Sequence, residues 1–159
     1  MMMETTAEKK RPPFIPRNCY NSFMSPLEHT IQNGDKSMSL EDEIKKAVGD
    51  HGMWKKMLKK AVDTKEINIQ ISTIKADDQC SFGKWLYSST ITEKEKDSSH
   101  YQEVCELHAV FHEKASEVAQ LAISGEKARA MKMLEVNGEF TTASAALTTS
   151  MMAWLKESK

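Results

Sequence analysis

Three histidines and one cysteine of this chain have the types and spacing to hold a single metal ion. His108 and His112 stand four residues apart in CELHAVFHEK, a helical pattern, so both imidazoles project from one face. Cys80 opens the turn-like segment CSFGKWLY, and His51 lies on the apolar side of another helical stretch. Three neutral nitrogens and one thiolate complete the tetrahedral set of Zn²⁺ and leave no position for water or substrate. The four residues therefore predict a structural or sensing zinc site rather than a catalytic one.

Each of these residues could also have a structural role that involves no metal. A lone histidine such as His51 on an apolar helix face is usually a hydrogen-bonded core residue, and Cys80 could be a small buried hydrophobic side chain. A bundle without any metal would carry the same helices. Cys105 lies three residues before His108, but four ligands already suffice, so we interpret it as a core cysteine. The joint presence of all four candidates favours the zinc site.

Catalytic patterns are not found in the sequence. The HAVFH stretch lacks the glutamate that follows the first histidine in zinc proteases. We find no glycine-rich phosphate loop, no serine–histidine–aspartate set, and no repeated Glu-x-x-His motif of the kind that builds a di-iron bundle. We therefore expect that the protein is not an enzyme.

Size and composition bound the remaining possibilities. A chain of 159 residues can form one domain with a real core. Its net charge of −1 gives no basic field, so we expect no nucleic-acid partner. No apolar run approaches the roughly 20 residues that cross a bilayer, so we expect no membrane span, and no secretory signal is recognisable. Three cysteines without framework spacing favour reduced thiols and a cytoplasmic location.

The pattern of apolar residues predicts an all-α domain over residues 39–157. A first helix is expected from a cap at Ser39, with Asp42 reaching back, to about Asp63. Gly49 and Gly52 interrupt it, and close packing against a neighbouring helix would explain them. Residues 64–79 contain alternating isoleucines, which we interpret as an extended connection or a short helix.

Two further helices complete the expected fold. One runs from about Ser99 to Ser124, with both paired histidines on its buried stripe, and Gly125 ends it. The next runs over residues 126–157, with a weak point at Asn137-Gly138. Together these elements predict an antiparallel four-helix bundle with a short extra helical segment that carries the cysteine ligand.

Residues 1–38 differ from the rest of the chain. The stretch KKRPPFIPRN is rich in proline, and serine, glycine and asparagine follow, so we expect a disordered or flexible N-terminal leader. The apolar residues Phe14, Ile15, Tyr20 and Phe23 leave open a short docking peptide.

Three motifs in order resemble the chemoreceptor zinc-binding domain family, abbreviated CZB. They are the His-x-x-Trp-Lys pattern at 51–55, the Cys-x-Phe-Gly-x-Trp pattern at 80–85, and the His-x-x-x-His pattern at 108–112. The separations fit as well, with 29 residues from His51 to Cys80 and 28 from Cys80 to His108. The resemblance covers roughly residues 40–157.

The resemblance implies a helical bundle with a buried zinc on three histidines and one cysteine. Domains of this family are similar to cytoplasmic sensing modules of chemotaxis receptors and diguanylate cyclases, which make cyclic di-GMP, and they often act as homodimers. Zinc occupancy or oxidation of Cys80 would regulate output. The chain shows no coiled-coil signalling region and no cyclase domain, so we expect it to act through a signalling partner. Trp54, Gly83 and Trp85 are expected to pack around the site.

Two functions remain open from the sequence. In the first, the chain is a regulatory domain that senses zinc level or oxidants, the latter through a redox-reactive Cys80. In the second, the zinc is a permanent structural staple, and the protein is an adaptor that acts by protein–protein interaction.

Overall fold

A computed structural model describes residues 38–158 of the chain. The expected leader, residues 1–38, lies outside the described residues except for Met38, as does the possible docking peptide around Phe14. The described part contains helices, turns and bends and no strand, so the expected all-α fold class is confirmed. Its elements in chain order are α1 (Leu40–Thr64), α2 (Ile71–Lys75), α3 (Ser81–Leu86), α4 (Glu93–Lys96), α5 (Ser99–Ile123), α6 (Lys127–Leu134) and α7 (Glu139–Glu157).

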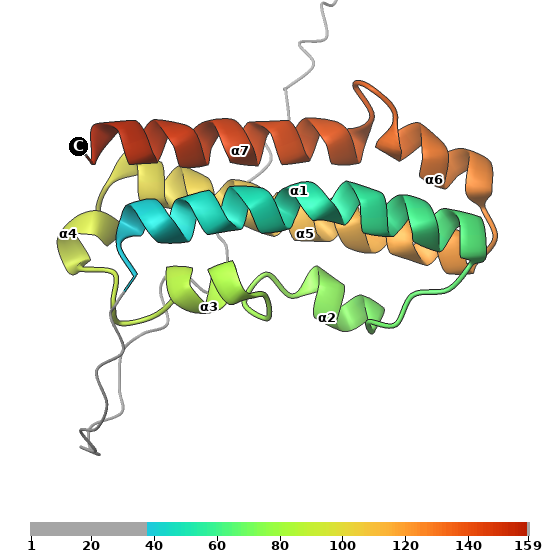
Figure 1. Cartoon of the computed structure of the whole chain (residues 1–159), viewed down its shortest axis with the longest axis horizontal. Coiled ribbons are helices and arrows are strands. Elements are labelled where there is room, and N and C mark those ends of the chain that lie inside the picture. Colours follow the sequence, from blue (N-terminus) through green and yellow to red (C-terminus); the bar gives the residue numbers. More distant parts are fainter. Residues whose placement is uncertain (1–37, 159) are drawn as a thin grey trace, which may run out of the picture.

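The helices are arranged as four antiparallel passes along one long axis (Figure 1). The first pass is α1, the short helices α2 and α3 return in a row, α5 runs beside α1, and α6 and α7 return again. Helix α5 packs against α1, α2, α4, α6 and α7 and so forms the centre of the structure. Three passes thus contain a long helix, whereas the second pass is made of two short helices joined by irregular chain.

Local sequence explains both ends of α1. The Ser39 hydroxyl accepts a hydrogen bond from the amide of Asp42 at 3.2 Å, and the Asp42 carboxylate accepts from the amide of Ser39 at 3.3 Å. This is the expected capping box, and acidic residues in the first turn favour the helix dipole. The helix ends at Lys65, whose left-handed backbone (φ 59°) lets its amide bond back to Ala61.

The two glycines inside α1 do not serve close packing. A Cβ atom built at Gly49 or at Gly52 would meet no described residue within 4 Å, and both glycines are exposed. The expectation that another helix packs against them is therefore wrong. Both glycines lie on the outer face of α1, away from the buried residues that include Ala47 and Leu58.

For residues 64–79 the sequence left open an extended connection or a short helix. The structure has a short helix there, α2. Ile67, Ile69 and Ile71 are partly buried against the core, and Ile74 of α2 is fully enclosed. Apolar anchoring therefore holds this segment onto α5, even though α2 has only 5 residues. Isolated helices of this length are not stable in water, so tertiary contacts must hold α2 in place.

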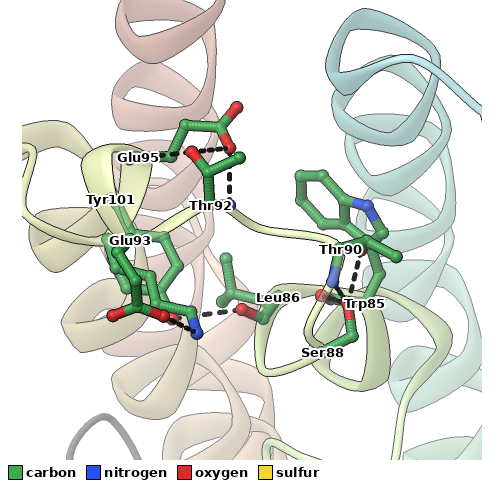
Figure 2. Close-up of polar contacts among 9 residues, drawn as sticks. Trp85, Leu86, Ser88, Thr90, Thr92, Glu93, Glu95 and Tyr101 are labelled. Carbon is green, nitrogen blue, oxygen red and sulfur yellow. Dashed lines mark hydrogen bonds and ion pairs between the residues drawn. The ribbon is translucent and has the colours of Figure 1, made fainter.

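The connection from α3 to α5 is held by local polar contacts (Figure 2). Thr92 and Glu95 form a capping box at the start of α4, with the Thr92 amide 2.8 Å from the Glu95 carboxylate. The Tyr101 hydroxyl donates from α5 to the carbonyl of Leu86 at the end of α3, at 3.1 Å. This last bond joins the far end of α3 to the central helix.

The expected helix over 126–157 is two helices rather than one. It breaks between α6 and α7, where Asn137 has a positive φ of 65°. A Cβ atom at Gly138 would lie 2.4 Å from the carbonyl oxygens of Lys132 and Met133, so the chain folds back closely onto the end of α6. The asparagine and glycine thus form a turn, because these two residue types tolerate such backbone and such proximity.

One apolar core fills the space among α1, α5 and α7. Its largest fully buried side chains include Phe111, Phe140, Ile44, Leu58, Leu147 and Met151. None of the helices in the described part of the chain is long and apolar enough to cross a membrane.

Replacing either exposed glycine of α1 by alanine should stabilise the protein. Because no residue in the described part of the chain comes within 4 Å of a Cβ atom at Gly49, Gly49→Ala should raise the free energy of unfolding by about 0.5–1 kcal/mol, and Gly52→Ala should do the same. Urea unfolding in excess zinc measures the change. Gly83→Ala is the matched control, since its Cβ would lie 1.8 Å from the Asp77 carbonyl oxygen and should destabilise. A loss of stability in Gly49→Ala would mean that another surface covers this face.

Candidate metal centre

Four side chains from three separate elements converge in the middle of the molecule. His51 lies on α1, His108 and His112 lie on α5, and Cys80 immediately precedes α3 as its N-cap residue. One nitrogen or sulfur atom from each of these four side chains lies within 4.8 Å of every other. The three histidines are buried, with 4% exposure or less, and Cys80 is partly buried. The structure therefore brings together the four residues that the sequence singled out.

Two of the histidines are oriented by backbone carbonyl groups. His51 Nδ1 lies 2.7 Å from the carbonyl oxygen of Ala47, one turn earlier in α1. His112 Nδ1 lies 2.7 Å from the carbonyl oxygen of Ile74 in α2. A carbonyl oxygen can only accept, so in each ring Nδ1 carries the proton and Nε2 keeps its lone pair. Both Nε2 atoms are buried and have no hydrogen-bond partner among the described residues.

His108 is held differently from the other two histidines. Its Nε2 lies 3.3 Å from Cys80 Sγ, and its buried Nδ1 has no hydrogen-bond partner in the described part of the chain. Ring packing fixes its orientation instead. The His108 ring centroid lies 4.7 Å from that of His112, 5.1 Å from that of His51 and 5.2 Å from that of Phe82, each in an edge-to-face arrangement.

The thiol of Cys80 is presented by the start of α3. Cys80 Sγ accepts a hydrogen bond from the amide of Gly83 at 3.1 Å. This is the bond by which an N-cap side chain satisfies the first amides of a helix. Gly83 is required here, because its Cα lies directly against the carbonyl group of Asp77. Lys46 of α1 reaches the Ser81 hydroxyl at 3.2 Å and ties the start of α3 to α1.

Aromatic side chains enclose the cluster. Phe82 packs edge-to-face on the rings of His51 and His108, and Phe111 packs on His51 and His112. Trp54 contacts His112, with ring centroids 5.7 Å apart. Trp85 stacks on Phe82 and also contacts Trp154, so it supports the cluster one step away from the histidines. These contacts exclude water from the histidine side of the site.

Burial dominates the electrostatics of all four groups. It lowers the pKa of His51 to about 4 and lowers the pKa of His108 and His112, because a charged imidazole would lose its hydration. The hydrogen bonds to Ala47 and Ile74 partly oppose this for His51 and His112. Burial also raises the pKa of the Cys80 thiol, although the Gly83 amide opposes the shift. Near neutral pH the histidines are therefore neutral, the form that binds metal.

The donor set fits one zinc ion. Zinc bonds of about 2.0–2.1 Å to nitrogen and 2.3 Å to sulfur place neighbouring ligand atoms about 3.3–3.6 Å apart in a tetrahedron. The 3.3 Å separation of Cys80 Sγ and His108 Nε2 is already close to such an edge. The Nε2 atoms of His51 and His112 are buried and carry lone pairs for which residues 38–158 offer no hydrogen-bond partner. A cation between the four atoms would satisfy them and would also hold the cysteine as a thiolate.

Sequence reasoning did not find the groups that orient the ligands. The Ala47 carbonyl lies four residues before His51, which is the ordinary i−4 relation on a helix, so this contact could have been anticipated. The Ile74 carbonyl belongs to a separate short helix, and no local pattern points to it. The roles of Phe82 and Phe111 also depend on how the helices pack.

Comparison with known proteins identifies one related family. The family model described as the chemoreceptor zinc-binding domain matches residues 51–119. This match confirms the resemblance, over a narrower range than the residues 40–157 inferred from the motifs, and it includes all four residues of the cluster. No curated protein and no solved structure matches the chain.

The buried histidines should make the metal-free protein sensitive to mild acid. In the unfolded chain a histidine binds a proton near pH 6.5, whereas His51 in the folded chain does so only near pH 4. The unfolded state therefore binds more protons between these values, and the free energy of unfolding should fall as pH falls. For His51 we expect the slope to rise toward about 1.4 kcal/mol per pH unit as pH falls from 6.5 to about 5, above the carboxylate range. His108 and His112, whose pKa burial also lowers, should add to it in the same direction.

Urea unfolding of the chelator-treated chain across this range measures that slope, and His51→Gln should reduce it because one titrating group is lost. A free energy of unfolding that stays constant from pH 6.5 to 5 would contradict the burial of these rings as neutral groups.

Proposed function

We propose that this chain, whose residues 51–119 belong to the chemoreceptor zinc-binding domain family, holds one zinc ion on His51, Cys80, His108 and His112 and uses it for regulation. The observation that carries the proposal is the convergence of these four side chains, with the lone pairs of two buried histidines left without a protein partner. Leaving such groups unsatisfied costs free energy, typically 1–3 kcal/mol for each group. A bound ion removes this cost.

A regulatory role fits the ligand set better than a catalytic one. Four protein ligands close the coordination sphere of zinc and leave no position for an activated water. The matched family is a zinc-binding regulatory domain and not a catalytic family. A site of this kind links helices α1, α3 and α5, so the presence of the ion bears on how these helices pack.

Cys80 is the ligand best suited to leave the ion. The three histidines are buried on long helices, whereas Cys80 is partly exposed and stands at the start of a helix of only 6 residues. Hypochlorous acid (HOCl) would oxidise the thiolate sulfur by two electrons. The sulfur gains an OH group and becomes a sulfenic acid, and the chlorine is released as chloride. The sulfur of a sulfenic acid is a poor zinc ligand. Oxidation would therefore weaken the site, which makes Cys80 the redox-reactive residue of the proposal.

A regulatory domain of this kind would transmit its signal to a partner protein. We infer a cytoplasmic module that reports zinc level or oxidants to chemotaxis or cyclic-di-GMP signalling, either as a homodimer or through another signalling protein. The name of the matched family supports the link to chemoreceptors. The competing function is a structural adaptor with a permanent zinc staple. The two differ in one property, which is how easily the zinc is lost.

The purified protein should hold one zinc ion per chain. Native mass spectrometry of protein prepared without added metal measures this. Cys80→Ser and His112→Ala should each lower the occupancy or the affinity, because each removes one of the four converging atoms. Cys105→Ala is the matched control, since Cys105 is a buried cysteine of the same helix as His108 but stands outside the cluster. A parent chain that binds no zinc even after supplementation would disprove the proposal.

Oxidation should release the zinc if the site senses oxidants. Stoichiometric hypochlorite added to the zinc-loaded protein should liberate zinc, followed with a zinc indicator dye, in step with sulfenic acid formation at Cys80. Retention of zinc under both hypochlorite and a chelator would instead favour the permanent staple. Zinc loss to the chelator, but not to the oxidant, would favour sensing of zinc level.

A further inference from the structure

A hydrogen bond between two side chains closes the chain segment that carries Cys80. The Tyr87 hydroxyl donates to the carboxylate of Asp77, and both residues are partly buried. Asp77 lies three residues before Cys80, and Tyr87 is the residue that ends α3. The bond therefore joins the two ends of the segment 77–87. We call this pair the Asp77–Tyr87 clasp.

The backbone of Asp77 also lies directly beneath the thiol. The Asp77 carbonyl is so close to Gly83 that a Cβ atom there would approach its oxygen to 1.8 Å. Gly83 in turn donates its amide to Cys80 Sγ, and Cys80 Sγ lies 3.8 Å from the Asp77 carbonyl oxygen. The position of Asp77 thus determines the space in which the sulfur sits.

Other contacts hold α3 but do not hold the residues before it. Phe82 and Leu86 are buried in the core, and Tyr101 donates to the Leu86 carbonyl (Figure 2). Lys46 reaches Ser81 from α1. All of these contacts act on residues after Cys80. In the loop before Cys80, the Gln79 amide donates to the Ala76 carbonyl at 3.3 Å, and the clasp adds a side-chain anchor to this loop.

We propose that Asp77 and Tyr87 are positioning residues for Cys80, and that their hydrogen bond determines how tightly the cysteine holds the metal and how readily it leaves. This inference rests on the proposed function, because it assumes that Cys80 is a zinc ligand. The clasp keeps the loop folded beneath the sulfur, so that Sγ stays close to His108 Nε2. Without it, the three histidines remain in place on their long helices, and only the sulfur gains freedom.

Tyr87→Phe tests the clasp by removing a single hydroxyl group. Groups that orient metal ligands typically contribute 10- to 100-fold in metal affinity. We expect Tyr87→Phe to weaken zinc binding about tenfold, measured by competition with a chelator. In the Co²⁺-substituted protein it should also weaken the sulfur-to-cobalt charge-transfer band, which reports the cysteine bond directly, and should speed alkylation of Cys80.

Tyr101→Phe is the matched control. It also removes one tyrosine hydroxyl that bonds to this region, but its partner is the Leu86 carbonyl at the far end of α3. In the Tyr101→Phe variant, the sulfur-to-cobalt charge-transfer band and the rate of Cys80 alkylation should equal those of the parent chain. Equal changes in the two variants would overturn the proposal, since they would reflect general loosening of α3. Unchanged affinity and spectrum in Tyr87→Phe would overturn it as well.

Substitution of the acceptor gives an independent test. An asparagine at position 77 can still accept from the Tyr87 hydroxyl, so Asp77→Asn should retain more affinity than Asp77→Ala. Adding Tyr87→Phe to Asp77→Ala should cause little further loss, because the two residues act through one bond. Fully additive losses would overturn the clasp.

A measurement without metal separates the clasp from the zinc site itself. In the chelator-treated protein, the Gly83 amide should exchange its hydrogen faster in Tyr87→Phe than in Tyr101→Phe, because the loop beneath it opens more often. Equal exchange rates would contradict the clasp. Failure of the proposed function has a different signature: Cys80→Ser would then leave zinc binding unchanged.

Discussion

The structure depends on the burial of three neutral histidines around one thiol. Removing imidazole rings from water prevents them from carrying charge, and it also leaves nitrogen lone pairs that must find a partner. The Nδ1 groups of His51 and His112 bond to backbone carbonyls, and their buried Nε2 atoms have no hydrogen-bond partner among the described residues. A cation would be the natural partner for such a group of atoms, and α1, α5 and the start of α3 pack so that all four donor atoms converge.

The two sides of this centre are built from elements of different length. The histidine side is built from α1 and α5, each 25 residues long, and is enclosed by Phe82, Phe111 and Trp54. The cysteine side is built from a helix of 6 residues and the loop before it. If Cys80 leaves the ion as proposed, the ligand that moves is the one on the shortest element, and the three histidines stay on the long helices.

The short helix α2 connects the centre to the rest of the second pass. Its Ile74 carbonyl accepts the hydrogen bond from His112, and the Ile74 side chain is buried against α5. A displacement of His112 would therefore act on α2, and a displacement of α2 would act on His112. The isoleucines of residues 64–79 alternate with polar residues, and this pattern indicates only that one side of the segment is buried. It predicts neither the length of α2 nor the hydrogen bond that the Ile74 carbonyl accepts from His112.

Residue types and their spacing were enough to predict the four candidate metal ligands and most of the long helices. The His-x-x-x-His spacing places two imidazoles on one helix face wherever that helix lies, and Ser39 with Asp42 caps α1 through contacts three residues apart. Such relations are local, so they can be inferred from the order of residues. The break at Asn137-Gly138 was visible as a weak point but not as a turn, since only the close approach to Lys132 and Met133 requires it.

The surroundings of each residue follow from how the helices pack. Gly49 and Gly52 suggested a neighbouring helix, yet no described residue lies near them, because a glycine in a sequence does not reveal which side of its helix is covered. The Ile74 carbonyl, the packing of Phe82 on the histidines and the bond between Asp77 and Tyr87 join residues through space. Contacts of this kind depend on where separate helices lie relative to one another, and local periodicity carries no information about that placement.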